Sequence, residues 1–228
     1  MRGMFVSSIG TSEGKTVVAA ALAAALQSSG LRIAAVKPME TGCTPVAQDA
    51  QALALAAGDP SLAYHPGFYR AELPASPYAV EIEGERAAPS LAELGHAVAL
   101  VADGRDGALV EGAGGLFVPI NRAELVADLA QALGLPVLLV ATNRLGVLSN
   151  VLATYEAAQR RSLRIAAIVL NQHVACDDST RTNRMILAER IACPVLDFPR
   201  VNLGDQEQLA RAATASGLLR VALRELEA

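Results

Sequence analysis

The stretch Met4–Thr16, MFVSSIGTSEGKT, decides the fold. It starts with apolar residues, passes through small polar residues and glycines, and ends in Gly14-Lys15-Thr16. The apolar, alanine-rich run 17–26 follows and predicts a buried helix. A strand, a glycine-containing loop, Lys-Thr and a helix occur in this order in phosphate-binding P-loops. In such a loop the backbone N–H groups and the helix N-terminus bind the anion, Lys15 reaches the β- and γ-phosphates, and the Thr16 hydroxyl binds Mg²⁺.

The loop departs from the usual P-loop pattern in one respect. That pattern places a glycine five positions before the second glycine, where this chain has Ile9. Gly-Lys-Thr alone is common by chance. Its position between an apolar strand and an apolar helix is what indicates a P-loop.

The composition favours a helix-covered parallel sheet. Of the 228 residues, 52% are hydrophobic, yet only 4% are aromatic and tryptophan is absent, so Ala, Val, Leu and Ile must build the core. The net charge of −4, without a basic run, argues against a nucleic-acid partner. No apolar run has the length of a membrane span and no signal-peptide pattern opens the chain, so we expect no membrane partner and a cytoplasmic location. The three cysteines form neither a zinc pattern nor a disulfide framework.

Apolar runs alternate with helical patterns along the chain. Further strands are expected at 31–37, 107–111, 136–141, 165–171 and 194–198, and helices at 49–57, 90–103, 125–133, 146–161, 181–191 and from 205 onward. The proline-rich segment 60–89 is interpreted as a loop with room for a short strand or helical turn. Six or seven strands in this order predict an α/β fold: one doubly wound, mostly parallel sheet of the P-loop NTPase type, with helices on both faces.

Several polar residues stand where predicted strands end or helices begin. Lys37 ends the second strand, Asp49 begins a helix, and Glu111 ends the strand GALVE before Gly112-Ala113-Gly114-Gly115. Each has an ordinary alternative: an exposed lysine, a helix N-cap and an exposed glutamate. The carboxyl ends of parallel strands form the ligand-binding edge of such sheets, and strand-end acids hold Mg²⁺ in P-loop enzymes. We therefore expect these residues near the P-loop.

Two features near residue 175 allow more than one interpretation. Asn171, at a strand end, could read a nucleobase or simply cap a loop. His173 with Asp177 and Asp178 could suggest a metal site, but the spacing fits no known ligand pattern. We favour a helix cap for 177–180.

With these residues in place, the chain resembles the dethiobiotin synthetase family, ATP-dependent enzymes of biotin biosynthesis. The resemblance runs nearly end to end, and its most specific part is the ordered pair Lys-Pro-x-x-Thr-Gly and Val-Glu-Gly-Ala-Gly-Gly after an N-terminal P-loop. The matching residues are Glu13–Thr16, Lys37-Pro38, Thr41-Gly42, Asp49, Val110–Gly115, Leu145-Gly146 and Asn171.

The family's P-loop has one more residue between its glycines than the usual pattern, which accounts for Ile9. Two departures from the family stand out. The first loop glycine falls on Ser8, so this position must avoid a strongly positive φ or be strained. An acid common two positions before the second glycine falls on Ser12, and we assign no catalytic role to the neighbouring Glu13.

The resemblance implies a ligase that closes a cyclic urea on 7,8-diaminononanoate. CO₂ adds to one amine as a carbamate, the carbamate attacks the γ-phosphate of ATP, and the second amine closes the ring and expels phosphate. ATP is a co-substrate and Mg²⁺ the cofactor. A homodimer is implied, with the substrate's carboxylate held at a helix N-terminus of the second subunit. Residues 1–228 would form a single P-loop synthetase domain.

The resemblance also implies roles for individual residues. Catalytic roles fall on Lys37, Lys15 and Thr11, and the metal ligands are Thr16, Asp49 and Glu111. The nucleotide is bound by Ser12, Glu13, Gly14, Lys15, Thr16, Glu111, Gly112, Ala113, Gly114, Asn171, Gln172, Pro199, Arg200 and Val201. The substrate is bound by Thr11, Lys37, Thr41, Gly114, Gly115, Gly146, Val147, Leu148, Ser149 and Asn150.

Three other functions remain in competition. An amidoligase of the same group, such as a cobyrinate a,c-diamide synthase, would carry a glutaminase domain, which this sequence does not offer. A partitioning or septum-positioning ATPase usually has a second lysine early in the P-loop, where this chain has serine and glycine. A degenerate family member that binds nucleotide without turnover is kept open by Ser8 and Ser12.

Overall fold

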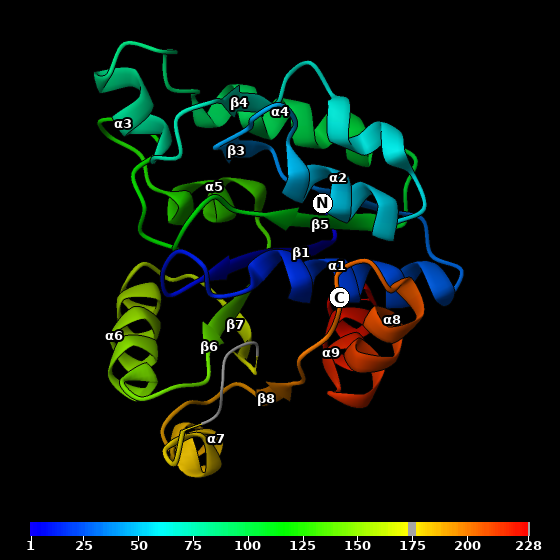
Figure 1. The fold of residues 1–228 in the computed structure, drawn as a ribbon, viewed down its shortest axis with the longest axis vertical. Coiled ribbons are helices and arrows are strands. Elements are labelled where there is room, and N and C mark those ends of the chain that lie inside the picture. Colours follow the sequence, from blue (N-terminus) through cyan, green and yellow to red (C-terminus); the bar gives the residue numbers. More distant parts are fainter. Residues whose placement is uncertain (173–176, 228) are drawn as a thin grey trace.

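The computed structural model describes residues 1–172 and 177–227 and has a six-stranded sheet at its centre (Figure 1). The strand order is β2-β5-β1-β6-β7-β8, and every pairing in this sheet is parallel. Because β1 is central and later strands add on both sides of it, the sheet is doubly wound, as predicted. The strands are β1 (Gly3–Ser8), β2 (Ile33–Val36), β5 (Gly107–Glu111), β6 (Val137–Thr142), β7 (Ile165–Asn171) and β8 (Val195–Phe198).

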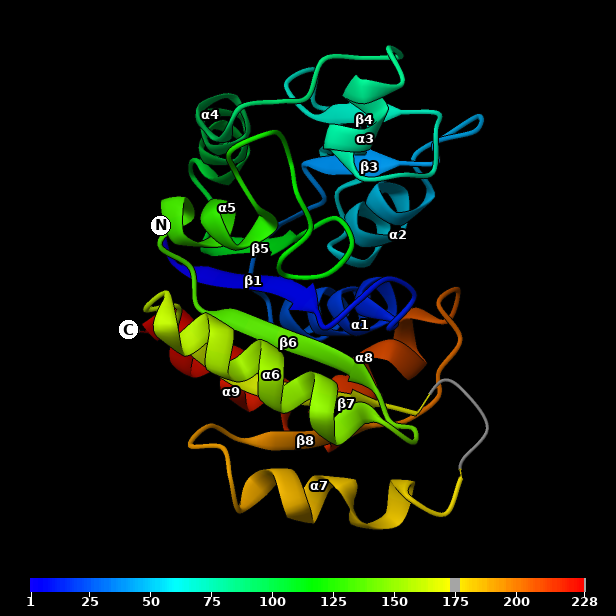
Figure 2. The same ribbon diagram turned by 90° about the vertical axis from the view of Figure 1, so that its left-hand side faces the viewer.

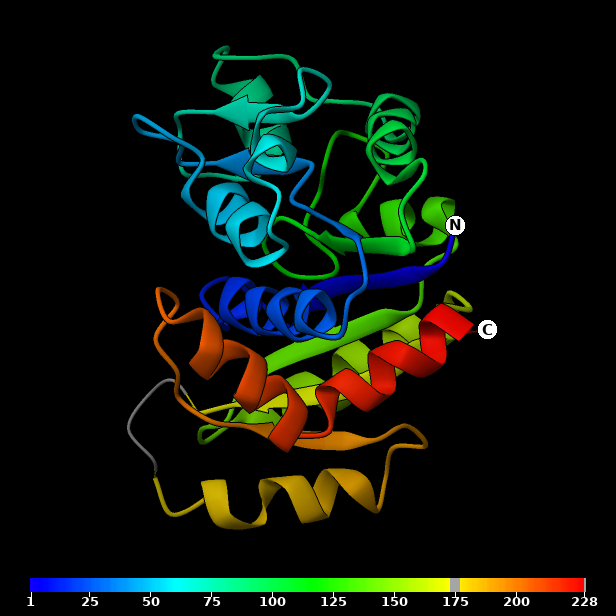
Figure 3. The same cartoon turned by 90° about the vertical axis from the view of Figure 1, so that its right-hand side faces the viewer.

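Helices cover both faces of this sheet (Figures 2 and 3). One face packs against α1 (Lys15–Ser28), α8 (Gln206–Ala215) and α9 (Leu218–Glu227). The other face packs against α4 (Leu91–Ala102), α5 (Val126–Leu133), α6 (Val147–Arg160) and α7 (Thr180–Ala188). Alternate residues of β1 face opposite sides, so Phe5 joins one core and Met4 and Val6 join the other. All predicted strands and helices outside 60–89 are confirmed: 107–111 and 165–171 coincide with β5 and β7, and the ends of the others differ by at most three residues.

The register of the strands brings their carboxyl ends to one edge. Val6 of β1 pairs with Glu111, and Ser8 pairs with Val140 of β6. The loops that follow β1, β2 and β5 therefore emerge side by side. Ligands bind at this edge in open α/β sheets.

The segment between β2 and α4 is more regular than predicted. It contains β3 (Met39–Thr41), α2 (Gln48–Ala56), the 3₁₀ helix η1 (Pro60–Tyr64), β4 (Tyr69–Ala71) and α3 (Pro77–Ile82). β3 and β4 pair as a separate parallel two-stranded sheet, which lies above the main sheet in Figure 1. Three-residue strands are too short to show a periodicity. The prolines that looked like breaks open η1 and α3, because proline fits the first turn of a helix.

Two predicted helix caps have different outcomes. Ser90 caps α4, and Glu93 completes the capping box, as the spacing predicted. Asp49 is not an N-cap: α2 begins at Gln48, its N-cap residue is Ala47, and Asp49 lies in the first turn with its side chain elsewhere.

Three further expectations concern membrane spans, cysteines and a metal site, and the structure bears on them only through residues 1–172 and 177–227. None of their helices has the length and apolar character needed to cross a bilayer. Cys43 and Cys193 are free thiols. His173 and Cys176 lie outside the described residues, so the metal interpretation of His173 stays untested.

Candidate active site

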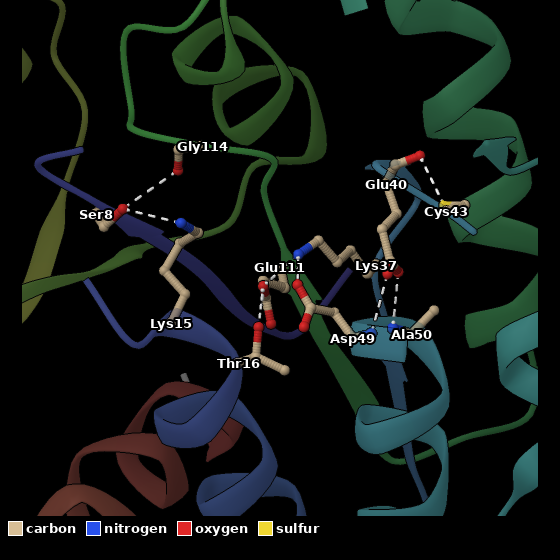
Figure 4. Close-up of polar contacts among 10 residues, drawn as sticks. All are labelled: Ser8, Lys15, Thr16, Lys37, Glu40, Cys43, Asp49, Ala50, Glu111 and Gly114. Carbon is tan, nitrogen blue, oxygen red and sulfur yellow. Dashed lines mark hydrogen bonds and ion pairs between the residues drawn. The ribbon is translucent and has the colours of Figure 1, made fainter. Parts of the chain in front are cut away.

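A cavity of about 340 Å³ opens at the carboxyl edge of the sheet, beside the P-loop. Five segments surround it: the β1–α1 loop with the first turn of α1, the residue after β2, β3, the first turn of α2, and the end of β5 with its glycine loop (Figure 4). All six residues predicted for catalysis and metal binding line it. The lining residues are Thr11, Ser12, Gly14, Lys15, Thr16, Val17, Lys37, Glu40, Thr41, Asp49, Glu111, Ala113 and Gly114.

A buried charge network lies at the centre of the cavity. The Lys37 ammonium donates to Glu111 Oε1 at 2.8 Å and also to the Asp49 carboxylate, and the Glu111 side chain is fully buried. Burial disfavours the charged form of Lys37, but the charges and hydrogen bonds of Glu111 and Asp49 outweigh it and raise the pKa of Lys37. Lys37 is therefore held as a cation, and it is not the exposed lysine of the ordinary interpretation.

The oxygen atoms of this network fit a magnesium ion. The Thr16 hydroxyl donates to Glu111 Oε1 at 2.9 Å. Glu111 Oε2 is buried and has no hydrogen-bond partner in the described part of the chain, and an orphaned carboxylate oxygen is costly unless a ligand uses it. The Asp49 side chain is 40% exposed and faces the same space. The described residues contain no group of three or more His, Cys, Asp or Glu that could hold a metal ion. A magnesium ion at this site would therefore need ligands from the nucleotide phosphates or water as well.

Lys15 is a second buried cation, on the P-loop side of the cavity. Its ammonium donates to Ser8 Oγ at 3.1 Å. Burial lowers the pKa of Lys15; Glu111 opposes this shift and Lys37 adds to it. An ammonium with one hydroxyl partner in a buried site is well placed to gain an anionic ligand.

The backbone of the P-loop shows how the chain tolerates Ser8. Ser8 remains in β1 with an ordinary backbone conformation, as expected; its hydroxyl donates to the carbonyl oxygen of Gly10 at 2.5 Å and lies 3.2 Å from that of Gly114. Left-handed conformations fall instead on Gly14, with φ of 84°, and on Ser12, with φ of 60°. The strain at a non-glycine residue therefore lies on Ser12.

The glycine loop after β5 contacts the P-loop closely. A Cβ atom on Gly115 would meet the backbone of Gly10 at 3.2 Å, so a larger residue would push the loops apart. Leu116 N also donates to Ser8 O at 2.8 Å. The two glycine-containing loops thus form one wall of the cavity.

Glu13 and Asn171 have structural contacts. The buried Glu13 carboxylate accepts from Thr142 N at 2.6 Å and pairs with Arg144, and Asn171 Nδ2 donates to the Glu13 carbonyl at 3.1 Å. Both side chains hold the P-loop against the ends of β6 and β7. A nucleotide contact by either residue stays a prediction.

Other predicted binding residues lie along the same edge without lining this cavity. Gln172 N donates to Phe198 O at 2.9 Å, which places it beside Pro199–Val201 after β8. Gly146–Asn150 form the start of α6, after β6. Gly112 and Gly115 belong to the loop of the cavity wall. The substrate and adenine contacts of these residues stay predictions.

The sequence did not single out Glu40 as a site residue. It is buried, lines the cavity and bonds to the start of α2. The signal was present, since Glu40 lies inside the motif Lys37–Gly42, but nothing local showed that a strand would turn it inward.

Similar solved structures share the fold at low sequence identity. A cobyrinic acid a,c-diamide synthase from Mycobacterium smegmatis, with bound ATP analogue and magnesium, matches with a TM-score of 0.53 and 20% identity, covering 96% of this chain and 95% of that one. The septum site-determining protein MinD from Pyrococcus horikoshii, complexed with Mg-ADP, matches with a TM-score of 0.54 and 16% identity, covering 99% and 92%. At this identity the likeness shows a P-loop NTPase-like α/β fold and nothing about activity.

Sequence relatives are more informative. A family model described as an AAA domain matches residues 2–199. An ATP-dependent dethiobiotin synthetase BioD from Anaeromyxobacter dehalogenans (strain 2CP-C) is 40% identical over 220 residues, covering 95% of this chain and 96% of the relative. One from Caulobacter sp. (strain K31) is 36% identical over 215 residues, covering 92% and 93%. Together with the P-loop cavity and its paired lysine and carboxylates, these matches establish that the chain belongs to the ATP-dependent dethiobiotin synthetase family and is a ligase.

Proposed function

We propose that this protein closes the ureido ring of dethiobiotin from 7,8-diaminononanoate, CO₂ and MgATP. The observation that supports the proposal is the arrangement of Lys15, Lys37, Thr16 and Glu111 around one cavity at the sheet edge. Two buried ammonium groups face a space lined by a P-loop, which suits the transfer of a phosphoryl group to an anionic acceptor. Residues 1–228 would act as one synthetase domain.

The reaction proceeds in three steps. One amine of the substrate attacks CO₂ and loses a proton, which gives a carbamate. A carbamate oxygen attacks the γ-phosphorus of ATP and ADP leaves, which gives a carbamic-phosphoric anhydride. The second amine attacks the carbonyl carbon, phosphate leaves with the bonding electron pair, and loss of a proton completes the cyclic urea.

The protein contributes charge and position to these steps. Lys15 and Lys37 neutralise the charge on the phosphoryl oxygens and the carbamate, and inside a buried site this effect is larger than in water. Thr11, Thr41 and the Gly114-Gly115 backbone would orient the carbamate and the diamine. Asn171, Gln172 and Pro199–Val201 would hold the adenine.

A magnesium ion would be held by Thr16, Asp49 and Glu111. When bound, it supplies positive charge beside the nucleotide phosphates. Lys37 shares both carboxylates with this site. The ammonium and the metal site are therefore coupled by charge.

Phosphate release from MgATP and bicarbonate, with and without 7,8-diaminononanoate, tests the proposal. We expect release that depends on the diamine, and mass spectrometry should identify dethiobiotin in the same sample. Phosphate release at the same rate with and without the diamine would contradict the proposal and favour the partitioning-type ATPase. Nucleotide binding without any release would favour the degenerate family member.

We also propose a homodimer in which Gly146–Asn150 of one subunit hold the substrate's carboxylate in the other. The N-terminus of α6 attracts anions, and Leu145, which directly precedes α6 and is 80% exposed, would pack against the second subunit.

Changing Leu145 to aspartate should therefore convert the dimer to a monomer in sedimentation analysis and raise the KM for the diamine. Leu55, which is 58% exposed on α2, gives the matched control: Leu55→Asp should leave the dimer and the KM unchanged. A wild-type chain that sediments as a monomer at assay concentration and turns over fully would contradict the dimer.

A further inference from the structure

Glu40 is a buried carboxylate between the small sheet and the active-site cavity. The residue is only 6% exposed, and it lines the cavity together with Lys37 and Asp49. Oε1 accepts from Asp49 N at 3.0 Å, and Oε2 accepts from Ala50 N at 2.9 Å (Figure 4). Glu40 therefore binds the first turn of α2 in a bidentate manner.

The start of α2 depends on this carboxylate. The first N–H groups of a helix have no partner inside the helix, and the N-cap residue Ala47 has no side chain that could accept from them. Glu40 supplies the missing acceptors from β3, nine and ten residues earlier in the chain, and its negative charge suits the helix N-terminus. Burial raises the pKa of Glu40, while the two backbone hydrogen bonds and the Lys37 charge lower it.

The backbone around Glu40 is fixed by the second sheet. In β3 it pairs in register with Arg70 of β4. Beyond β3, Cys43 N donates to Ala71 O at 2.9 Å, and Tyr69 N donates to Pro38 O at 2.8 Å on the other side. The carboxylate thus projects from a segment that is anchored at both ends.

Glu40 joins the two segments whose side chains form the charge network. Lys37 precedes it by three residues, and Asp49 donates its N–H group to it. The Asp49 side chain is 40% exposed, so packing alone does not hold its carboxylate against the Lys37 ammonium. The hydrogen bond from Asp49 N to Glu40 instead fixes the backbone of Asp49, and with it the position from which the Asp49 side chain extends.

We propose that Glu40 is a positioning residue, which holds the first turn of α2 so that the Asp49 carboxylate reaches Lys37 and the magnesium site. The proposal rests on the proposed function, which names Asp49 as a magnesium ligand, but its test does not require the ring-closing reaction. Residues that orient metal ligands typically contribute 10- to 100-fold to metal affinity.

The test measures Mn²⁺ binding by electron paramagnetic resonance with a non-hydrolysable ATP analogue and no diamine. Glu40→Ala should weaken Mn²⁺ binding about 10-fold. Glu93→Ala is the matched control, because Glu93 also accepts at a helix N-terminus but lies at α4, away from the cavity. Glu40→Ala leaves two N–H groups of α2 without their buried acceptor, so it should lose more melting temperature than Glu93→Ala, whose carboxylate is exposed. Only Glu40→Ala should lose Mn²⁺ affinity.

A double-mutant cycle separates positioning from a general structural role. If Glu40 acts through Asp49, adding Glu40→Ala to Asp49→Ala should cost less than 2-fold further affinity, because the ligand to be positioned is already gone. A full additional 10-fold loss, or wild-type Mn²⁺ affinity in Glu40→Ala, would overturn the proposal. If Glu40→Ala does not fold, Glu40→Gln takes its place in the cycle: it keeps the size and one acceptor, and should show an intermediate loss that also disappears in the Asp49→Ala background.

These Mn²⁺ affinities are measured without the diamine and without ATP hydrolysis, so they do not depend on the ring-closing reaction. A wild-type protein that binds Mn²⁺ but shows no diamine-dependent phosphate release would refute the proposed function and leave the Glu40 cycle interpretable. An active wild type with additive losses would refute only the role of Glu40.

Discussion

Replacing Lys15 with alanine is expected to lower the rate of diamine-dependent phosphate release by about 10³-fold while the protein remains folded. The Lys15 ammonium lies buried at the cavity, and its hydrogen bond in the structure goes to the Ser8 hydroxyl rather than to a core carboxylate. Burial lowers its pKa, so the free protein gains little from this charge. The charge should matter when phosphates bind, because they place anionic oxygen atoms directly against an ammonium whose hydrogen bond in the structure goes to a neutral hydroxyl.

Turnover and thermal unfolding of the same sample measure this prediction. Lys15→Met keeps most of the side-chain length without the charge and should be as slow as Lys15→Ala, which separates electrostatics from volume. Unchanged turnover in either variant would refute the P-loop role of Lys15. A large loss of melting temperature would show instead that the lysine stabilises the fold.

Replacing Glu111 with glutamine is expected to raise the Mg²⁺ concentration for half-maximal activity and to lower turnover by about 10²-fold. Glu111 is fully buried, and its Oε1 accepts from both Thr16 and Lys37. The amide carries no charge for the metal, and an amide nitrogen placed at either oxygen position cannot accept. The effect should be larger on Mg²⁺-dependent activity than on diamine binding.

The same substitution should lower the pKa of Lys37. Glu111 contributes to the upward shift of that pKa, so its removal leaves burial opposed by Asp49 alone. Lys15 and Lys37 are the two lysines of the chain, so ¹³C-methylated lysine signals in an NMR titration report on both directly. The control is Glu225→Gln, which removes a carboxylate of α9 that pairs with Arg164, far from the cavity. It should change neither the pKa of Lys37 nor the Mg²⁺ concentration for half-maximal activity. Equal activity of Glu111→Gln at every Mg²⁺ concentration would remove Glu111 from the metal site.

Much of the fold could be predicted because its signals are local. The apolar runs that became β1, β5, β6 and β7 are continuous, as strands buried on both faces must be. The alanine-rich run after Thr16 and the Ser90–Glu93 capping box mark helices by their own residues. Parallel strands also imply a common carboxyl edge, so the approach of Glu111 to the P-loop followed from chain order.

The small sheet could not be predicted. β3 and β4 have three residues each, too few for a period, and their pairing joins segments separated by prolines that locally indicate breaks. Asp49 was open to interpretation as a cap because an aspartate before a helix usually is one. In the structure, the bidentate bond from Glu40 takes over the capping of α2 and leaves the Asp49 carboxylate to Lys37.

The sequence by itself therefore determined the P-loop, the doubly wound sheet and the edge at which the site lies. Only the tertiary structure decided which charges meet there: Lys37 with Glu111 across 74 positions of the chain, Thr16 with Glu111 across 95, and Glu40 with the start of α2. The physical reason is the range of the interactions. Periodicity, capping and loop chemistry act between near neighbours in the chain and can be seen in a window of residues. A buried ion pair forms only after long-range strand pairing has removed water and fixed the distance between its partners.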